Sequence, residues 1–148
     1  MKPPYPYELR ASSADDTPFV KTTWMQSYHD RSLGSISASS LQWSRYKQLM
    51  RPLLDALISR GSLIVACDPQ ESGVIYGWAL GEGGDVPVLH YAYVRPERRR
   101  YGLADEMLAR LASETGRLVE ASHITEAGRW IVRSKGLVYN PLTARLAA

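Results

Sequence analysis

The sequence is poor in cysteine and in long apolar runs, and each shortage excludes a class of protein. Its 148 residues include a single cysteine, Cys67, so an intramolecular disulfide is impossible. Cys67 stands in the apolar run SLIVAC, which favours a small buried side chain in a reducing, cytoplasmic setting. No run of about 18 apolar residues occurs, and the opening MKPPYPYEL lacks an apolar core, so we expect neither a membrane span nor an export signal.

The charge also lacks a strong bias. The 18 Lys and Arg residues and 15 Asp and Glu residues give a formal net charge of +3. This excess is too small to diagnose nucleic-acid binding, although it is compatible with an anionic ligand. Because 45% of the side chains are hydrophobic, the chain can bury a core, and we expect one domain over residues 1–148.

The first thirty residues predict one strand and one helix. The segment YELRA, residues 7–11, has the composition of a short strand. Thr17 followed by Pro18 is a typical helix start, with a capping hydroxyl and a proline in the first turn. We expect this helix to run to about His29.

A second helix is predicted after the loop RSLGSISASS. Ser39 or Ser40 is placed to cap it, and apolar residues recur at intervals of three and four from Trp43 to Ile58. Pro52 interrupts the pattern, which predicts a kink or two abutting helices.

Beyond Gly61 the sequence predicts strands and shorter helices. A hairpin is expected over 62–67 and 74–80, then a strand over 86–94, with Pro87 suited to an edge or a bulge. The remaining predicted elements are a helix from Leu103 to about Glu114, a strand over 117–122, a helix from Glu126 to about Lys135, and a strand over 137–142. This order predicts an α/β or α+β sheet covered by helices.

The stretch YVRPERRRYGLADEML places four arginines before a glycine and a helix start. The first amides of a helix have no acceptor within the helix and lie at the positive end of its dipole, where phosphate binds. Gly102 allows a ligand to approach the backbone closely, and Arg98, Arg99 and Arg100 supply countercharge. An ordinary solvated basic turn remains the alternative, because one glycine is a weak phosphate-loop motif.

The segment VRPERRRYGLA resembles the acyl-CoA-binding signature of the GNAT superfamily of N-acyltransferases. In that signature a strand ending in valine precedes Arg or Gln, two residues of any type, Gly, any residue, and Gly or Ala, and Arg99, Gly102 and Ala104 fill the defining positions. The element order resembles that fold over nearly the whole chain. The resemblance implies a mixed, mostly antiparallel central sheet covered by helices, and it extends to small phage-encoded or bacterial members.

The resemblance also implies acetyl-CoA as co-substrate. No Cys/His cluster has metal-ligand spacing, so we expect no metal. The thioester would enter a gap between the strand carrying Val94 and the strand RLVEAS, where an N–H near Val94 would stabilise the oxyanion. The residues implied in CoA binding are Tyr93, Val94, Arg99, Arg100, Tyr101, Gly102, Leu103 and Ala104.

His90 is the first candidate for the base that deprotonates the amine. In a regular strand it shares a face with Ala92 and Val94, and an imidazole titrates near neutral pH. Some arylalkylamine acetyltransferases carry a histidine at the matching position. His123 is a second candidate, while His29 is expected to be structural. For His90 and His123 a structural role, in the core or at the surface, stays open.

The sequence departs from the family at the residue that serves as general acid. Many relatives carry a tyrosine four residues before a Gly-Phe pair, which protonates the departing thiolate. Here that position is Val132, and Leu137 replaces the phenylalanine. Tyr139 is the candidate substitute, with Ser134 second, and a core-strand role for Tyr139 remains open.

The acceptor is an amine that the sequence does not identify. The resemblance places Tyr28, Trp43 and the loop RSLGSIS at the acceptor site. An amine on a protein, on an aminoacylated RNA or on a DNA base remains an alternative, as does a non-catalytic module that binds CoA or another anion. A homodimer is also left open.

Overall fold

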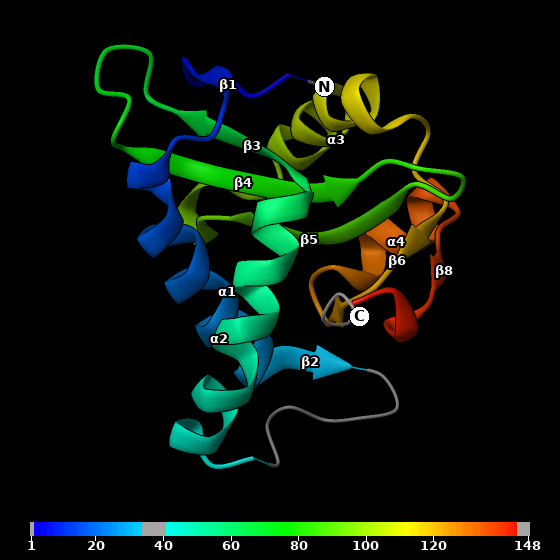
Figure 1. The fold of residues 1–148 in the computed structure, drawn as a ribbon. Coiled ribbons are helices and arrows are strands. Elements are labelled where there is room, and N and C mark those ends of the chain that lie inside the picture. Colours follow the sequence, from blue (N-terminus) through cyan, green and yellow to red (C-terminus); the bar gives the residue numbers. More distant parts are fainter. Residues whose placement is uncertain (1, 34–40, 145–148) are drawn as a thin grey trace.

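The computed structural model describes residues 2–33 and 41–144 (Figure 1). Its helices and strands follow the predicted order, with one extra pair of short strands. In chain order they are β1 (Glu8–Ala11), α1 (Thr17–Arg31), β2 (Ser32–Leu33), α2 (Trp43–Arg60), β3 (Ser62–Cys67), β4 (Ile75–Glu82), β5 (Val88–Val94), α3 (Leu103–Thr115), β6 (Glu120–Ala121), β7 (Ile124–Thr125), α4 (Arg129–Lys135) and β8 (Val138–Tyr139).

Six of the strands form one sheet in the order β1-β3-β4-β5-β6-β8. Neighbours from β1 to β5 are antiparallel, whereas β5, β6 and β8 run parallel. The pair β2 and β7 makes a separate antiparallel ribbon. The predicted fold class, a mixed and mostly antiparallel sheet covered by helices, is confirmed.

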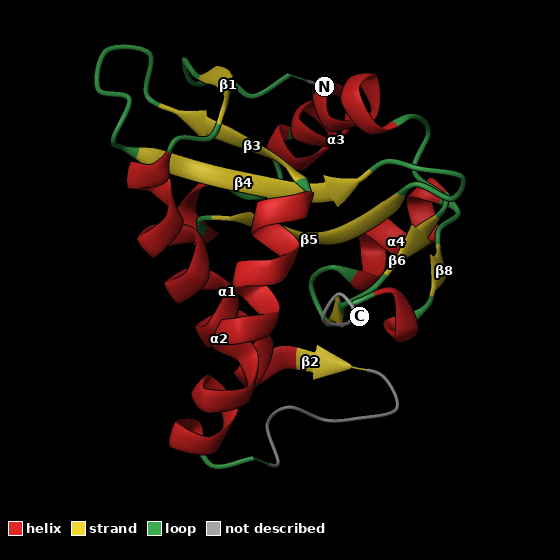
Figure 2. Cartoon of the chain, viewed as in Figure 1, coloured by secondary structure: helices red, strands yellow, loops and turns green. Residues whose placement is uncertain are grey.

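Helices cover both faces of the sheet (Figure 2). Side chains alternate along the strands, so Val65 and Trp78 pack with α1 and α2, whereas Ile64 and Ala79 pack with α3. Each face of the sheet therefore has its own apolar core. Strands β6 and β8 continue the sheet beyond β5. Over the described part of the chain, no helix combines the length and apolar character needed to cross a bilayer.

The start of α1 differs from the prediction. A short 3-10 turn over Ala14–Asp16 precedes the helix, and the Asp16 carboxylate accepts a hydrogen bond from the Ser13 amide at 2.8 Å. Thr17 already has helical backbone angles, so its predicted role as the cap is wrong. The helix continues to Arg31, two residues beyond the predicted end.

Gln42 occupies the N-cap position of α2. The predicted caps, Ser39 and Ser40, lie outside the described residues. The helix continues through Pro52 as one element, so the alternative of two abutting helices is wrong.

The carboxyl-terminal elements are shorter than predicted. Strand β6 has two of the six residues expected, α4 begins at Arg129 rather than Glu126, and β8 has two residues. Strand β6 pairs with β5 only at Val88 and Leu89. Beyond that point the segment after β6 moves away from β5, so a longer β6 would have no partner there.

A bulge in β5 changes the direction of His90. Leu80 pairs with Tyr91, but the next residue of β4, Gly81, pairs with Leu89, so His90 is the extra residue. Ala92 and Val94 pack in the α3-side core, whereas the His90 ring contacts Glu82 of β4. The prediction that His90 shares a face with Ala92 and Val94 is therefore wrong, because the bulge interrupts the alternation.

Candidate functional site

A cleft opens where β5 and β6 separate. The two strands pair only at Val88 with Glu120 and at Leu89 with Ala121, and within residues 2–33 and 41–144 no strand lies beside the rest of that β5 edge. The cleft has a volume of about 640 Å³, within the range of small-molecule sites. Its walls are the end of α1, β5, the loop leading into α3 with the start of that helix, and the segment from Thr125 to α4.

The free edge of β5 presents main-chain groups to the cleft. The Arg95 amide donates to the Tyr76 carbonyl at 2.8 Å, so by alternation the Tyr93 amide also faces β4. The amides of Ala92 and Val94 then face the cleft. The Val94 carbonyl faces it too, because it accepts a hydrogen bond from Arg99 Nε at 2.7 Å. Tyr93 and Val94, which were predicted to bind CoA, both line the cleft, and their role in binding stays a prediction.

The loop at the outer end of the cleft is rich in unpaired amides. Arg100 has a φ of 72° and Gly102 a φ of 89°, so the chain turns twice through the left-handed region before α3 begins. The amides from Arg100 to Asp105 donate to no acceptor within the described residues. Successive free amides at a helix start form a concave site for an anion.

The arginines of the loop occupy distinct positions. The Arg98 guanidinium lies over the rings of Tyr5 and Tyr76, at 4.5 and 4.2 Å from their centres. Arg99 is held by the Val94 carbonyl and lies 5.7 Å from the Tyr93 ring, whereas Arg100 is exposed. All three line the cleft, so their charges surround the free amides. Two of them are fixed by their contacts, unlike the side chains of an ordinary solvated turn.

The other predicted loop residues contribute differently. Leu103 and Ala104 line the cleft, and Leu103 is also buried in the α3-side core. The Tyr101 side chain is 41% exposed and packs edge-on against Tyr5 at 6.0 Å, so only its backbone belongs to the loop site.

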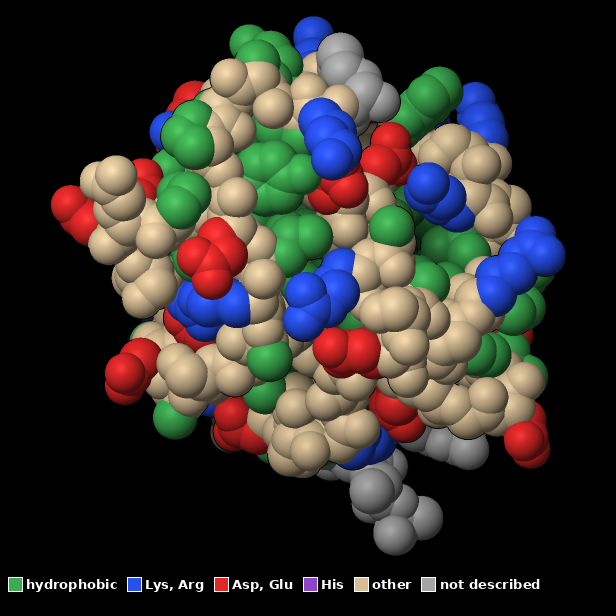
Figure 3. Space-filling view, turned by 90° about the horizontal axis from the view of Figure 1, so that it is seen from above, with side chains coloured by type: hydrophobic (Ala, Val, Ile, Leu, Met, Phe, Trp, Pro, Cys, Tyr) green, Lys and Arg blue, Asp and Glu red, His purple; other side chains and the backbone are tan. Residues whose placement is uncertain are grey.

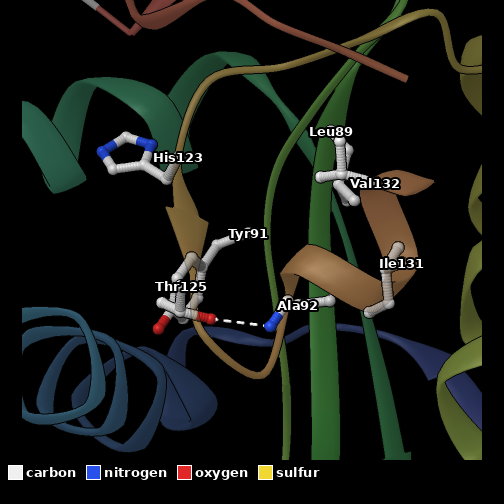
Figure 4. Close-up of a pocket in the computed structure, with 8 residues that line it drawn as sticks. Leu89, Tyr91, Ala92, His123, Thr125, Ile131 and Val132 are labelled. Carbon is white, nitrogen blue, oxygen red and sulfur yellow. Dashed lines mark hydrogen bonds between the residues drawn. The ribbon is translucent and has the colours of Figure 1, made fainter. Parts of the chain in front are cut away.

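The inner end of the cleft narrows into a small recess of about 20 Å³. Tyr91, Ala92 and Thr125 line both the cleft and the recess, so the two are continuous. Figure 4 shows His123 and Tyr91 on one side of the recess and Ile131 and Val132 on the other.

Thr125 fixes the turn that leads from β7 into α4. Its Oγ1 atom accepts a hydrogen bond from the Gly128 amide at 2.9 Å, drawn as the dashed line in Figure 4. Thr125 and Gly128 both line the recess, so this bond holds the wall that α4 contributes.

His123 lies among aromatic rings at the recess. The ring centres of Tyr28, Trp24 and Tyr91 are 4.9, 5.3 and 6.4 Å from that of His123. Desolvation, followed by the proximity of His90, lowers the pKa of His123 to about 3. The imidazole is therefore neutral across the physiological range.

His90 does not line the cleft or the recess. Its side chain is 1% exposed, Nδ1 lies 2.7 Å from Ser122 Oγ, and Nε2 lies 2.9 Å from Glu82 Oε1. Burial lowers the pKa of His90 although Glu82 opposes that shift. His90 therefore has no direct path to a bound amine, and any part it takes in proton transfer must go through a neighbour.

Tyr139 lies on β8, paired through Ala121 to the far side of β6. It lines neither the cleft nor the recess, and burial raises the pKa of its phenol. Val132, at the position of the missing tyrosine, does line the recess, so the departure falls at the inner end of the cleft. Ser134 is exposed and its Oγ donates to the Ile131 carbonyl. The catalytic role of Tyr139 stays a prediction.

No family model and no curated protein sequence gives a significant match to this chain. Several solved structures, in contrast, are similar to it. A GCN5-related N-acetyltransferase from Ralstonia eutropha is 14% identical, covers 97% of both chains and has a TM-score of 0.63. Another from Rhodopseudomonas palustris is 15% identical, covers 90% of this chain and 81% of its own, and has a TM-score of 0.61.

A third solved structure carries a ligand. It is a predicted acetyltransferase of Clostridium acetobutylicum with acetyl-CoA, 14% identical, with a TM-score of 0.58 over 91% of this chain and 92% of its own. These likenesses show that the chain has the fold of the GNAT superfamily of acyltransferases. At such identities they establish the fold alone.

Proposed function

We propose that this protein is an N-acetyltransferase that moves the acetyl group of acetyl-CoA directly to an amine. The observation that carries the proposal is a series of main-chain groups that face the cleft. It runs from the amides of Arg100 to Asp105, along the open edge of β5, to the recess beside His123. The fold shared with a structure that contains acetyl-CoA supports this assignment.

In this proposal the diphosphate of CoA accepts hydrogen bonds from the loop amides, while Arg99 and Arg100 neutralise its charge. The pantetheine arm pairs with the cleft-facing groups of Ala92 and Val94, as an added strand would. The thioester then reaches the recess. Of the two cleft-facing amides, that of Ala92 lies at the recess, where it would donate to the thioester oxygen instead of the pantetheine arm and stabilise the oxyanion that forms when an amine attacks.

Direct transfer is favoured over an acyl-enzyme intermediate. Cys67, the single cysteine of the sequence, has no exposed surface and packs in the core beneath α1 and α2. It therefore cannot reach a thioester in the cleft. The neutral amine attacks the carbonyl carbon, the C–S bond breaks, and the products are an N-acetyl amide and the CoA thiol.

An acceptor on a nucleic acid requires a basic surface as well as the cleft. On the face shown in Figure 3, basic and acidic side chains are interspersed rather than gathered in one basic patch. This face therefore offers no continuous path for a phosphate backbone.

An acetyl-transfer assay tests the proposal. The protein is incubated with acetyl-CoA and a panel of aliphatic amines, arylalkylamines and lysine peptides, and both free thiol and acetylated amine are measured. We expect at least one amine to be acetylated with matching thiol release. Binding of acetyl-CoA without either product would instead identify a non-catalytic CoA-binding module.

A further inference from the structure

Four side chains form an unbroken line of hydrogen bonds that leads away from the recess. His123 Nδ1 lies 2.9 Å from Ser122 Oγ, and Ser122 Oγ lies 2.7 Å from His90 Nδ1. His90 Nε2 lies 2.9 Å from Glu82 Oε1, which also accepts from Arg60 Nε at 2.8 Å. The Glu82 side chain is 32% exposed, so the line ends at solvent.

The chemistry of Glu82 fixes the direction of every proton in this line. A carboxylate only accepts, so His90 must carry its proton on Nε2. Neutral His90 then has a lone pair on Nδ1, and the Ser122 hydroxyl donates its one proton to that atom. The Ser122 oxygen must in turn accept from His123, which therefore carries its proton on Nδ1.

In this arrangement Nε2 of His123 carries no proton and has a free lone pair. No described side chain makes a hydrogen bond to that atom, and His123 is only partly buried at the edge of the recess. The ring also makes a hydrogen bond with the His90 backbone, whose carbonyl lies 3.5 Å from Ser122 Oγ, the partner of His123 Nδ1. A neutral imidazole nitrogen with a free lone pair is a proton acceptor. Of the two histidines only His123 borders the recess, and Figure 4 shows its ring turned away from Ile131 and Val132, so an amine reaching Nε2 would approach from the side opposite α4.

We propose that His123, Ser122, His90 and Glu82 form a proton relay in which His123 Nε2 is the catalytic base and Glu82 stores the proton. The proposal rests on the acetyltransferase function proposed above. His123 is the residue that touches the reacting atoms, and the other three act through it.

The relay moves one proton out and back during each turnover. After the neutral amine attacks, its nitrogen loses a proton to His123 Nε2. The Nδ1 proton of His123 passes to Ser122, the Ser122 proton to His90 Nδ1, and the Nε2 proton of His90 to Glu82. The intermediate becomes neutral at nitrogen, and the carboxylate becomes a carboxylic acid.

The return transfer protonates the leaving group. When the C–S bond breaks, the CoA thiolate takes the proton from His123 Nε2, and each proton in the line moves back until Glu82 is again a carboxylate. Because nitrogen and sulfur are bound to the same carbon, one nearby imidazole can serve both. The relay thus supplies the proton that a tyrosine at position 132 would otherwise supply.

Charge and burial explain why one histidine alone would not suffice. An imidazolium at His123 is disfavoured by desolvation and by His90, while Tyr28 from α1 and Tyr91 from β5 surround the ring without a negative charge. Passing the proton to an anionic carboxylate creates no net positive charge in the interior. Desolvation would raise the pKa of Glu82, but hydrogen bonds from Arg60 and His90 keep it below its usual value, so the stored proton is readily returned.

Nitrogen-15 NMR of the histidine side chains tests the direction of the line in the protein without substrate. We expect the proton on Nε2 of His90 and on Nδ1 of His123 at neutral pH. His29 serves as an internal control, because its Nε2 lies 2.9 Å from the Leu41 carbonyl, which only accepts, and must therefore carry a proton. A proton on Nε2 of His123 would overturn the proposal whether or not any amine is acetylated.

A Glu82→Gln variant tests the proton store. The glutamine oxygen still accepts from His90 but cannot take up a proton. We expect kcat for the best amine of the panel to fall about 10- to 100-fold, and its dependence on pH to change, while the Kd of CoA is unchanged. The matched control is Glu71→Gln in the exposed β3–β4 turn, which should keep the wild-type kcat.

A Ser122→Ala variant breaks the line at its centre. We expect a similar loss of kcat, and the NMR spectrum should show that the proton of His123 is no longer fixed on Nδ1. Wild-type kcat in folded Glu82→Gln or Ser122→Ala would overturn the relay while leaving the acetyltransferase function intact. If wild type acetylates no amine, the proposed function fails, and the relay falls with it.

Discussion

The two ends of the cleft are built in different ways. The outer end comes from one continuous stretch, residues 93–105, and offers main-chain amides and arginines. The inner end brings together side chains from α1, β4, β5 and the segment between β6 and α4. Local backbone conformation is enough to make the first, whereas the second exists only when the whole sheet is assembled.

This difference separates binding from chemistry. An anion held by backbone amides depends on φ angles and on a glycine, so many side chains can change around it. A proton line depends on four side chains at hydrogen-bond distance, and one substitution breaks it. Changes at the outer end should therefore alter CoA affinity, and changes at the inner end should alter turnover.

The largest effect is expected for Gly102→Glu. The substitution places a carboxylate at the proposed diphosphate site and forces a residue with a Cβ into a φ of 89°. Like charges brought together at an interface cost several kcal/mol, so CoA affinity should fall at least about 100-fold in a calorimetric titration. Unchanged affinity would show that the diphosphate lies elsewhere.

Gly84→Glu is the matched control for this change. Gly84 also has a positive φ, 133°, but it is exposed in the β4–β5 loop and lies away from the cleft. The same strain and the same charge there should leave CoA affinity at the wild-type value.

The next effect in size is expected for Gly77→Ala in β4. A Cβ at this position would lie 2.6 Å from the Tyr93 carbonyl oxygen and 3.3 Å from Val94 Cα, which are backbone atoms of the cleft wall. Overpacking of this kind costs about 2–3 kcal/mol, measurable by urea unfolding, and should weaken CoA binding as β5 shifts. Gly73→Ala, with nothing within 4 Å, is the control, and an equal loss there would refute the close-contact explanation.

At the inner end, acid should unfold the protein partly through His123. Its pKa is lowered to about 3 from 6.5, so below pH 6.5 the unfolded chain binds a proton that the folded chain does not. The contribution of His123 to the free energy of unfolding is therefore complete above pH 6.5 and is lost as the pH falls. The loss is about 2 kcal/mol between pH 7.5 and 5. His90 acts in the same direction and His29, whose pKa is raised, in the opposite one.

Comparison with His123→Gln isolates this contribution. The variant keeps His90 and His29, so its free energy of unfolding should fall about 2 kcal/mol less than that of wild type over the same pH range. Parallel curves for the two proteins would mean that His123 is not desolvated in the fold.

The smallest effect is expected for Tyr91→Phe at the wall of the recess. It removes the hydroxyl that lies 2.7 Å from Ser27 Oγ but keeps the ring stacked on Trp24, with 5.0 Å between their centres. A loss of about 1 kcal/mol in chemical unfolding, with CoA affinity unchanged, follows from one hydrogen bond. A loss above about 3 kcal/mol would give Tyr91 a larger structural role than its contacts indicate.

The sequence predicted the fold and the outer end because both depend on local patterns. Apolar periodicity located the helices, and the segment from Arg99 to Ala104 already carried the glycine and the charges of the loop. The caps were less predictable, since Ser13 and Asp16 act through a 3-10 turn that periodicity does not reveal.

The inner end was predicted only in part because it depends on register. His90 was chosen for a face that a bulge then altered. Pro87 had indicated an edge or a bulge in this strand, but not that the extra residue would be His90. Ser122 and Glu82 were not foreseen, since each gains its meaning from a partner 32 or 8 residues away. His123 was ranked second on chain position alone.

The most direct test of the central claim is a titration of nitrogen-15-labelled protein with coenzyme A, followed by amide NMR. The resonances of Arg100 to Asp105, together with those of Ala92 and Val94, should shift and saturate at a common ligand concentration. If these amides stay unmoved at millimolar coenzyme A, the open edge of β5 and the loop before α3 do not form its site.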